Sequence, residues 1–298
     1  MDKKIKQNTN SVCNICPRKC GVNRTKTKGF CGADDNVKIS KVMLHHFEEP
    51  CISGLENGVG SGAIFFAGCN LKCVFCQNYE ISYFGKGKIY SIDKLVETIK
   101  NFELMGAYNI NLVTPTHFTE QILKALKIYK PKIPVVWNSG GYESVETIKK
   151  LEGFVDIYLV DLKYASNELA KRYSKADNYV QNNQAVIKEM FRQQSKNIYE
   201  NGLMKKGVII RHLVLPTHSS DSLKCLDFVA NEIGKSACVS LMSQYEPVFN
   251  AKDYPEINRK ITPIEYKRVV NHALKLNLMN CYTQDLSSAD CKKYTPKF

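Results

Sequence analysis

Three cysteines lie close together in the run CNLKCVFCQN, at Cys69, Cys73 and Cys76. Thiolates are the usual ligands of iron–sulfur clusters, so three at this spacing could hold three irons of a [4Fe–4S] cube. No fourth cysteine follows at ferredoxin spacing, which would leave one iron open. An electron-transfer cluster is normally closed by four protein ligands, so an open iron indicates a catalyst that binds a small molecule. Two other interpretations are a zinc site, usually built from paired ligands, and free thiols.

A second group of cysteines, Cys13, Cys16, Cys20 and Cys31, has the spacing C-x2-C-x3-C-x10-C. The surrounding segment has little apolar periodicity, so a bound metal would have to supply folding energy there. Zinc would close a structural tetrahedral site, and a second [4Fe–4S] cluster would suit the same four thiolates. Cys51 is either a fifth ligand or a free thiol.

Length and composition limit the class of protein. The chain has 298 residues, of which 44% are hydrophobic, enough for one large α/β domain with a small appendage. No apolar stretch reaches the length of a membrane span, and the polar start MDKKIKQNTNSV lacks the apolar core of a secretory signal. Twelve cysteines without an export signal fit metal ligation in a reducing compartment. We therefore expect a cytoplasmic protein without membrane association.

The formal net charge of +13 raises the question of nucleic acid, anionic cofactors or acidic protein partners. The lysines are spread over predicted helices and form no long basic tail. No RNA-binding motif and no stripe of alternating aromatic and basic residues is present. These features favour a solvated, lysine-rich surface and disfavour nucleic acid as a partner.

The hydrophobic pattern predicts alternating strands and helices from Ala63 onward. The expected strands cover 63–66, 110–114, 134–137, 155–161, 207–216 and 237–243. The expected helices cover 91–105, 119–129, 143–151 and 220–233, with helical segments between about 166 and 196 and a last helix starting at a capping box at Thr262. Residues 1–50 are predicted to be loop-like. We place the boundary between a cysteine-rich segment, 1–58, and the main domain, 59–298, in the Pro/Gly-bearing stretch 50–62.

Six β/α units predict parallel strands with helical crossovers, either in an open doubly wound sheet or in a partial barrel. In a barrel, functional groups gather at the carboxyl ends of the strands. The residues expected at those ends include Thr114, Thr116, His117, Asn138, Ser139, Gly140, Asp161, Lys163 and Arg211. His117 could act in catalysis or cap the next helix, and His212 is expected to be structural.

The run GCNLKCVFCQNYEIS resembles the signature of the radical S-adenosylmethionine (SAM) superfamily, and in particular the branch of pyruvate formate-lyase-activating enzymes and their uncharacterised relatives. The stretch EEPCISG followed by GVGSGAIFFAGC, and the N-terminal CxxCPxxC element, are similar to one uncharacterised part of that branch. The resemblance covers roughly residues 60–250. It implies a partial (β/α)6 TIM-like barrel, α/β in class, with a cysteine-rich N-terminal extension.

The resemblance also implies cofactors and roles. A [4Fe–4S] cluster on Cys69, Cys73 and Cys76 would bind SAM at its open iron and cleave it to a 5'-deoxyadenosyl radical. Lys163 of the D-L-K run would help to hold SAM, and Asp161 would lie near the SAM carboxylate. Arg211 resembles a SAM-contacting arginine, and a guanidinium suits a carboxylate.

A turn comparable to WNSGG holds SAM in that family, which implies cofactor binding at Asn138, Ser139 and Gly140. Asn138 stands where relatives often carry an aspartate, so a cation site that needs this carboxylate is not expected. Glu48 and Glu49 could contact substrate or be solvated carboxylates.

The sequence leaves the substrate open, and a glycine of a partner enzyme is one candidate. An electron donor of flavodoxin or ferredoxin type is the expected partner. Two other functions are weighed: an iron–sulfur electron-transfer protein with a closed cluster, and a zinc-ribbon module that binds nucleic acid. The barrel-like alternation over most of the chain disfavours both.

Overall fold

The computed structural model describes residues 12–55, 57–286 and 296. The strands of its main sheet that run parallel to one another are β2 (Ser61–Phe66), β4 (Ile110–Val113), β5 (Val135–Ser139), β6 (Ile157–Asp161), β8 (Leu203–Leu213), β9 (Cys238–Met242) and β10 (Cys281–Thr283). Strands β4 and β5 are buried along their whole length, so neither of their faces is open to solvent.

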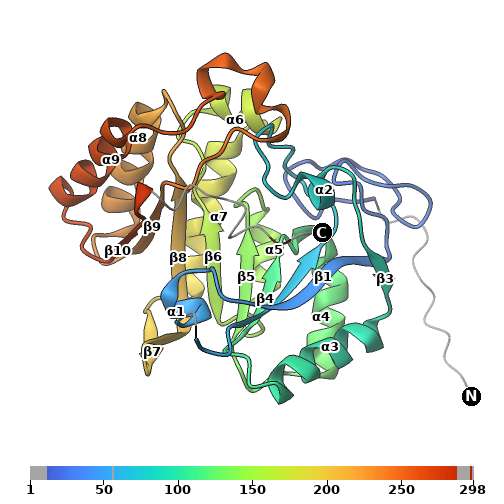
Figure 1. Cartoon of the computed structure of the whole chain (residues 1–298). Coiled ribbons are helices and arrows are strands. Elements are labelled where there is room, and N and C mark those ends of the chain that lie inside the picture. Colours follow the sequence, from blue (N-terminus) through green and yellow to red (C-terminus); the bar gives the residue numbers. More distant parts are fainter. Residues whose placement is uncertain (1–11, 56, 287–295, 297–298) are drawn as a thin grey trace, which may run out of the picture.

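The strand order decides between the two architectures left open by the sequence. Strands β2, β4, β5, β6, β8 and β9 are neighbours in the order in which they follow one another in the chain. A doubly wound sheet would reverse its strand order at a switch point, and this sheet does not. The α/β fold is therefore the predicted partial barrel, whose curved sheet is seen from its open side in Figure 1.

Three strands are antiparallel to their neighbours: β1 (Val37–His45), β3 (Lys88–Tyr90) and β7 (Ile198–Glu200). The prediction that residues 1–50 are loop-like was wrong for β1, which pairs with β2 along nearly its whole length. Its first residues alternate between buried Val37 and Ile39 and more exposed neighbours, the period of a half-buried strand. Strand β1 thus belongs to the main sheet. The boundary between a cysteine-rich segment, 1–58, and the main domain, 59–298, stays a prediction. The tail strand β10 was also not predicted.

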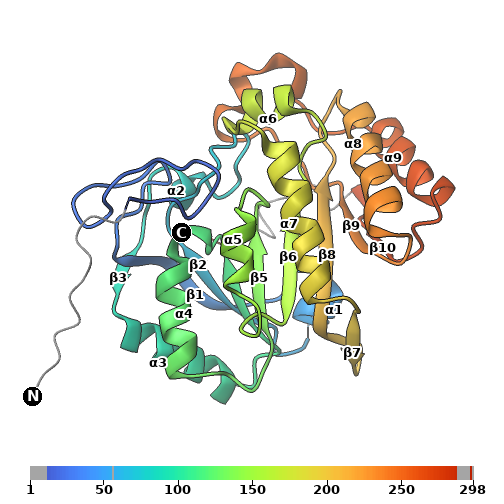
Figure 2. The same ribbon diagram turned by 180° about the vertical axis from the view of Figure 1, so that it is seen from behind.

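The helices are α1 (Pro50–Ser53), α2 (Tyr79–Ser82), α3 (Ile92–Leu104), α4 (Thr119–Ile128), α5 (Val145–Lys149), α6 (Asn167–Ser174), α7 (Tyr179–Gln193), α8 (Ser219–Phe228) and α9 (Pro263–Lys275). Short 3-10 turns cover Thr116–Phe118, Phe249–Asp253 and Pro255–Ile257, and α8 continues as a π-helical turn over Val229–Ile233. Figure 2 shows α3, α4, α5, α7, α8 and α9 on the outer face of the sheet.

Local sequence accounts well for the helices that the pattern predicted. In α3 the buried residues are Leu95, Val96, Ile99 and Phe102, which recur at the helical period. In α9 the predicted capping box is present, since the Thr262 side chain accepts from the Glu265 amide and the Glu265 carboxylate accepts from the Thr262 amide. The segment 166–196 is two helices, α6 and α7, because Lys175 and Asn178 adopt left-handed backbone angles between them.

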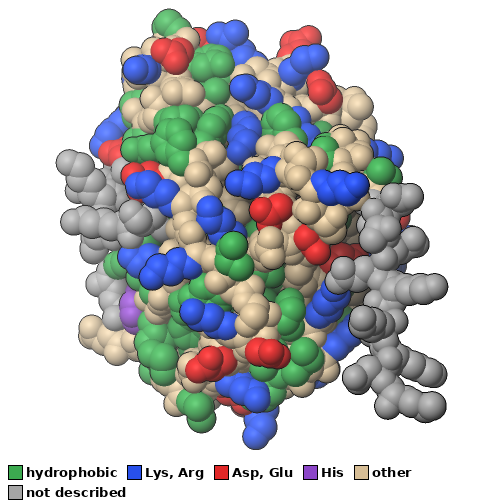
Figure 3. All heavy atoms as spheres, turned by 90° about the vertical axis from the view of Figure 1, so that its right-hand side faces the viewer, with side chains coloured by type: hydrophobic (Ala, Val, Ile, Leu, Met, Phe, Trp, Pro, Cys, Tyr) green, Lys and Arg blue, Asp and Glu red, His purple; other side chains and the backbone are tan. Residues whose placement is uncertain are grey.

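Basic side chains are scattered over the face shown in Figure 3 and are interspersed with acidic, apolar and uncharged ones. This distribution agrees with the expectation of a solvated surface for that face.

Within the described ranges, the helices are all too short or too polar to cross a lipid bilayer.

Candidate active site at the strand ends

A pocket of about 240 Å³ lies at the carboxyl ends of the parallel strands. The residues that line it include Glu48, Phe65, Cys73, Phe75, Cys76, Gln77, Val113, Asn138, Asp161, Lys163, Arg211, Leu213, Met242, Gln244 and Tyr245. They come from β1, β2, β4, β5, β6, β8 and β9 or from the loops that follow those strands. The pocket therefore brings together two of the cluster cysteines and four of the six predicted cofactor-binding residues.

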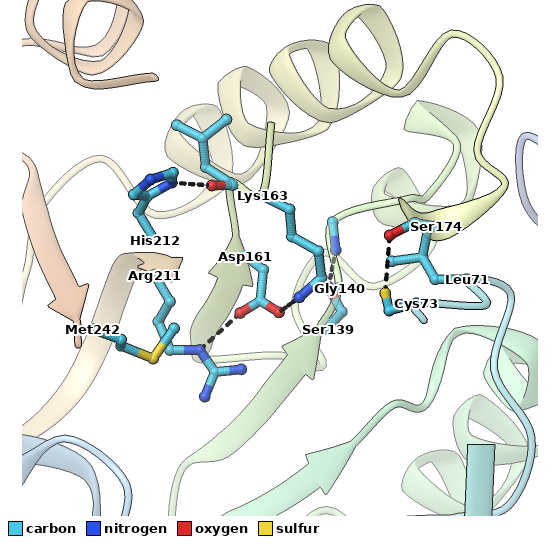
Figure 4. Close-up of polar contacts among 12 residues, drawn as sticks. Leu71, Cys73, Ser139, Gly140, Asp161, Lys163, Ser174, Arg211, His212 and Met242 are labelled. Carbon is cyan, nitrogen blue, oxygen red and sulfur yellow. Dashed lines mark hydrogen bonds and ion pairs between the residues drawn. The ribbon is translucent and has the colours of Figure 1, made fainter. Parts of the chain in front are cut away.

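The cysteine loop follows β2 and begins at Gly68, whose φ of +90° favours glycine. The Cys73 thiol lies 3.0 Å from the Ser174 hydroxyl, and the Cys76 thiol lies 3.2 Å from the Ser82 hydroxyl. Helix α6 thus holds the Cys73 thiol and helix α2 holds the Cys76 thiol, and Figure 4 shows the first of these contacts.

The three thiols also interact with one another. Burial, together with the nearby Cys73 and Cys76, raises the pKa of Cys69 to about 12. Burial and then Cys73 raise the pKa of Cys76 to about 11. Three such thiols stay protonated without a cation, whereas thiolates are the ligands that iron requires. The donor set is therefore chemically suited to a cationic cluster, whose charge would make up for the cost of burying three thiolates.

Among the described residues, no three Cys, His, Asp or Glu side chains stand at metal-ligating distance in this conformation. This holds equally for Cys69, Cys73 and Cys76 and for the N-terminal cysteines. Binding at either group would require the thiols to turn from their present hydrogen bonds toward the metal.

Arg211, at the end of β8, stands at the centre of the charged part of the pocket. Its Nε donates to Asp161 Oδ1 at 2.9 Å, and its Nη2 donates to Asn138 Oδ1 at 2.6 Å. Its Nη1 donates to Glu48 Oε2 at 3.1 Å. Figure 4 shows the Asp161 carboxylate, at the end of β6, between Arg211 of the neighbouring strand β8 and Lys163 just after β6. The guanidinium therefore links β8 to β6, β5 and the segment after β1.

Asp161 is bound from both sides, because Lys163 Nζ donates to its other oxygen at 2.5 Å. Burial alone would raise the pKa of Asp161, but Lys163 and Arg211 outweigh it and lower the pKa below the usual value. Burial would lower the pKa of Lys163, and the Asp161 carboxylate reverses this and raises it. Asp161 and Lys163 are therefore both charged at neutral pH. A ligand carboxylate that enters the pocket would meet two fixed cations, Lys163 and Arg211.

The sequence did not identify Glu48 as part of this charged group. Its carboxylate accepts from Asn138 Nδ2 at 3.0 Å and from Asn111 Nδ2 at 2.9 Å, besides binding Arg211. Glu49 is buried as well, and burial raises the pKa of its carboxyl. The alternative that both are solvated carboxylates was wrong. The sequence did contain a signal for their burial, because both glutamates come just after a run of alternating apolar residues. That run was not recognised as a strand.

Ser139 and Gly140 lie beside the pocket and do not line it. The Ser139 hydroxyl donates to the buried carboxyl of Glu143 at 2.8 Å, which also accepts from Trp137 and Thr116. At Gly140 a Cβ atom would stand 2.8 Å from Leu71 in the cysteine loop. The Ser139 side chain therefore serves to hold the end of β5, and Gly140 allows the cysteine loop to pack closely against it.

Neither histidine of interest reaches the pocket. His117 is buried, its Nε2 lies 2.8 Å from the carbonyl of Ala67, and burial lowers its pKa to about 3. It thus supports the backbone just before the cysteine loop and caps no helix. His212 Nδ1 lies 2.6 Å from the Leu162 carbonyl in the interior, as expected of a structural histidine.

The four N-terminal cysteines are brought together in the loop that lies beside α2 in Figure 1. Cys16 interacts electrostatically with Cys31 and Cys13, and Cys20 hydrogen-bonds Cys13. Cys51 lies elsewhere, next to Cys238 and Tyr282, and so is not a fifth member of this group. Cys225 and Cys238 are buried, as predicted.

The sequence model of the Radical SAM superfamily matches residues 63–228, which span β2 to α8. The chain belongs to the radical SAM superfamily. Members of this enzyme superfamily generally hold a [4Fe–4S] cluster and cleave SAM, so the fold implies both cofactors. The comparisons give no support to a closed electron carrier or to a nucleic-acid-binding zinc ribbon.

Two relatives from Methanocaldococcus jannaschii are similar along most of the chain. The uncharacterized protein MJ0674 is 37% identical over 92% of this chain and 78% of its own length. The uncharacterized protein MJ0808 is 24% identical over 85% of this chain and 74% of its own length. Both alignments are longer than the superfamily match, so the likeness extends beyond the barrel core.

Among solved structures, Streptococcus suis SuiB superposes with a TM-score of 0.50 at 13% identity. The superposition covers 74% of this chain and 47% of SuiB. The chain thus spans about half the length of that protein. At this identity the likeness shows the shared fold, and it agrees with the radical SAM barrel derived above.

Proposed function

We propose that this radical SAM enzyme holds its cluster on Cys69, Cys73 and Cys76 and abstracts a hydrogen atom from a glycine of a partner protein. The observation that supports it best is one pocket with Cys73 and Cys76 on one wall and Asp161, Lys163 and Arg211 on another. The thiols suit the iron, and the charged groups suit the amino-acid end of SAM.

The cluster would be held by Cys69, Cys73 and Cys76 and, once reduced by an electron donor, would supply the electron for reductive cleavage of a carbon–sulfur bond of SAM. The residues of the chain bind and orient. Arg211 and Lys163 provide cations for the SAM carboxylate, and Asp161 and Glu48 provide acceptors for its ammonium group. Fixed charges of this kind hold the reacting bond in place without reorganisation during the reaction.

The remaining walls of the pocket are partly apolar. Phe65, Phe75, Val113, Leu213 and Met242 line it and would keep water away from a radical. Exclusion of water matters because a reactive intermediate is otherwise lost to side reactions.

The choice of a macromolecular substrate rests on the resemblance of the cysteine run to that of pyruvate formate-lyase-activating enzymes. A glycine in an extended peptide presents a narrow backbone without a side chain, which could reach the edge of such a site from outside. This resembles the action of pyruvate formate-lyase-activating enzymes.

The electron donor that we propose is a small flavodoxin or ferredoxin. Such carriers are acidic, and the net charge of +13 of this chain would favour their encounter. The rate of cluster reduction should therefore fall as the salt concentration rises.

The first test is anaerobic reconstitution with iron and sulfide, followed by SAM and dithionite, with 5'-deoxyadenosine measured by chromatography. We expect product from the unmodified chain and less than a hundredth of it from Cys73→Ala. Cys225→Ala, which removes a buried thiol far from the pocket, is the matched control and should keep most of the activity. Equal product from Cys73→Ala and the unmodified chain would disprove the assignment of the three cysteines.

The second test concerns the substrate. Cells that naturally contain the protein are grown with α-deuterated glycine, and their extract is separated into a protein fraction and a small-molecule fraction. We expect deuterium in 5'-deoxyadenosine only with the protein fraction. Deuterium transfer from the small-molecule fraction alone would reject a glycine of a partner protein while leaving SAM cleavage intact.

A further inference from the structure

The N-terminal cysteine loop contacts the loop that carries the cluster cysteines. We propose that Cys13, Cys16, Cys20 and Cys31 bind one zinc ion, and that this ion holds the loop of Cys69, Cys73 and Cys76 in place. The zinc site itself is independent of the proposed function, whereas its effect on the second loop rests on that function.

The four cysteines interact with one another, although their thiols would have to turn to bind one ion. The Cys13 thiol hydrogen-bonds that of Cys20, and Cys31 interacts electrostatically with both. A Cβ atom at Gly29 would lie 3.3 Å from the Cys20 sulfur and 3.5 Å from the Cys31 sulfur, so both sulfurs face the same glycine. Cys16 completes the group through its interactions with Cys31 and Cys13.

The backbone around these cysteines is arranged to stabilise thiolates. The amide two residues after the cysteine donates to the sulfur at Cys16, Cys20 and Cys31, from Arg18, Val22 and Ala33 respectively. Two of these turns are Cys-Gly pairs, in which Gly21 has φ +66° and Gly32 has φ +80°. A Cβ atom at either glycine would meet nothing within 4 Å. Glycine is therefore required there for its backbone angle, which aims the next amide at the sulfur.

Four thiolates close the tetrahedral coordination of one zinc ion, which is the usual ligand set of a structural site. Unlike the three cysteines of the cluster loop, these four ligands leave no coordination position open for a substrate.

The two cysteine loops are joined by direct bonds. The Cys69 amide donates to the Cys31 carbonyl at 3.0 Å, so a ligand of one group holds the backbone of a ligand of the other. A Cβ atom at Gly68 would stand only 2.6 Å from that same carbonyl. The contact is therefore tight and depends on the position of Cys31.

A second connection runs through Asn70, between Cys69 and Leu71. Its side chain hydrogen-bonds the Cys16 thiol, and its Nδ2 also donates to the Tyr142 carbonyl. Arg18 Nε donates to the Asn70 carbonyl at 2.8 Å. The N-terminal group thus holds the cluster loop through Cys31, Cys16 and Arg18, and a metal that fixes these residues fixes the loop.

The zinc site is tested in the full chain carrying Cys69→Ala, Cys73→Ala and Cys76→Ala together, which removes the cluster ligands. We expect this protein to be colourless and to contain about one zinc per chain and no iron, by elemental analysis. Iron and sulfide retained by the triple variant after reconstitution would overturn the proposal in favour of a second cluster. Absence of both metals would overturn it as well. Neither outcome depends on whether the unmodified chain cleaves SAM.

The effect on the cluster loop is tested with two further variants. Cys16→Ser with Cys20→Ser should lose the zinc and at least halve the iron bound per chain, whereas the control Cys281→Ser should change neither. Asn70→Ala keeps all four thiols, so it should retain zinc, fold normally by circular dichroism and still lose iron. Unchanged iron content in Asn70→Ala would overturn the coupling, even if the double variant failed to fold.

Discussion

The Glu48 carboxylate binds the Arg211 guanidinium at 3.1 Å across 163 residues of sequence. Glu48 also accepts from Asn138 Nδ2 at 3.0 Å. The structure thus places a carboxylate from the segment after β1 beside the Asn138 amide.

Removal of Arg211 should destabilise the protein strongly. Arg211→Met leaves the buried carboxylates of Glu48 and Asp161 without their shared cation, and breaking such a buried pair costs about 3–5 kcal/mol. The free energy of unfolding is measured by chemical denaturation. Lys188→Met removes an ion pair with Glu232 in which both side chains are about half exposed, and should change stability by less than about 0.5 kcal/mol. Equal losses in the two variants would contradict this account of the pocket.

Ser139→Ala should lower stability without affecting SAM binding. The Ser139 hydroxyl binds the Glu143 carboxyl at 2.8 Å, and loss of a buried hydrogen bond of this kind costs about 1–3 kcal/mol. Lys163→Met, in the pocket, should weaken SAM binding at least tenfold. Equilibrium dialysis with the reconstituted enzyme compares the two. A tenfold weaker affinity in Ser139→Ala would show that its side chain does serve the cofactor.

Stability should fall as the pH is lowered from 6.5 toward 4, in part because of His212. Burial lowers the pKa of His212 to about 4, so the unfolded chain takes up a proton in this range and the folded chain does not. A base with a lowered folded pKa therefore contributes stability that is present above pH 6.5 and lost below it. The loss amounts to about 3 kcal/mol at pH 4 for one such group.

The matched variant for this effect is His212→Asn, whose amide can still donate to the Leu162 carbonyl. Denaturation at several pH values between 7.5 and 4.5 should give a shallower slope for the variant. Identical slopes would mean that His212 is protonated in the folded protein.

Gly68→Ala should be far more damaging than Gly153→Ala. Both glycines have positive φ, +90° and +81°, so both substitutions carry a conformational cost of about 1–2 kcal/mol. At Gly153 a Cβ atom meets nothing within 4 Å, whereas at Gly68 it meets the Cys31 carbonyl at 2.6 Å. We expect iron binding to be lost only in Gly68→Ala. Normal iron content in that variant would show that the contact with Cys31 can yield.

The sequence by itself determined the features that depend on local pattern and spacing. The cysteine triad, the six parallel strands and the capping box at Thr262 all follow from residue types within a few positions of one another. Hydrophobic period and capping act locally, so they can be read without knowledge of the fold. The predicted gathering of Asn138, Asp161, Lys163 and Arg211 followed from the rule that parallel strands end at one edge.

Only the tertiary structure decided which side chains face the pocket. Ser139 follows Asn138 directly, yet the alternation of a strand sends their side chains to opposite sides. Glu48 and the contact between Cys31 and Cys69 come from pairings that no local pattern encodes. Such contacts depend on the register of β1 on β2 and on the packing of one loop against another, and these are set by the whole folded chain.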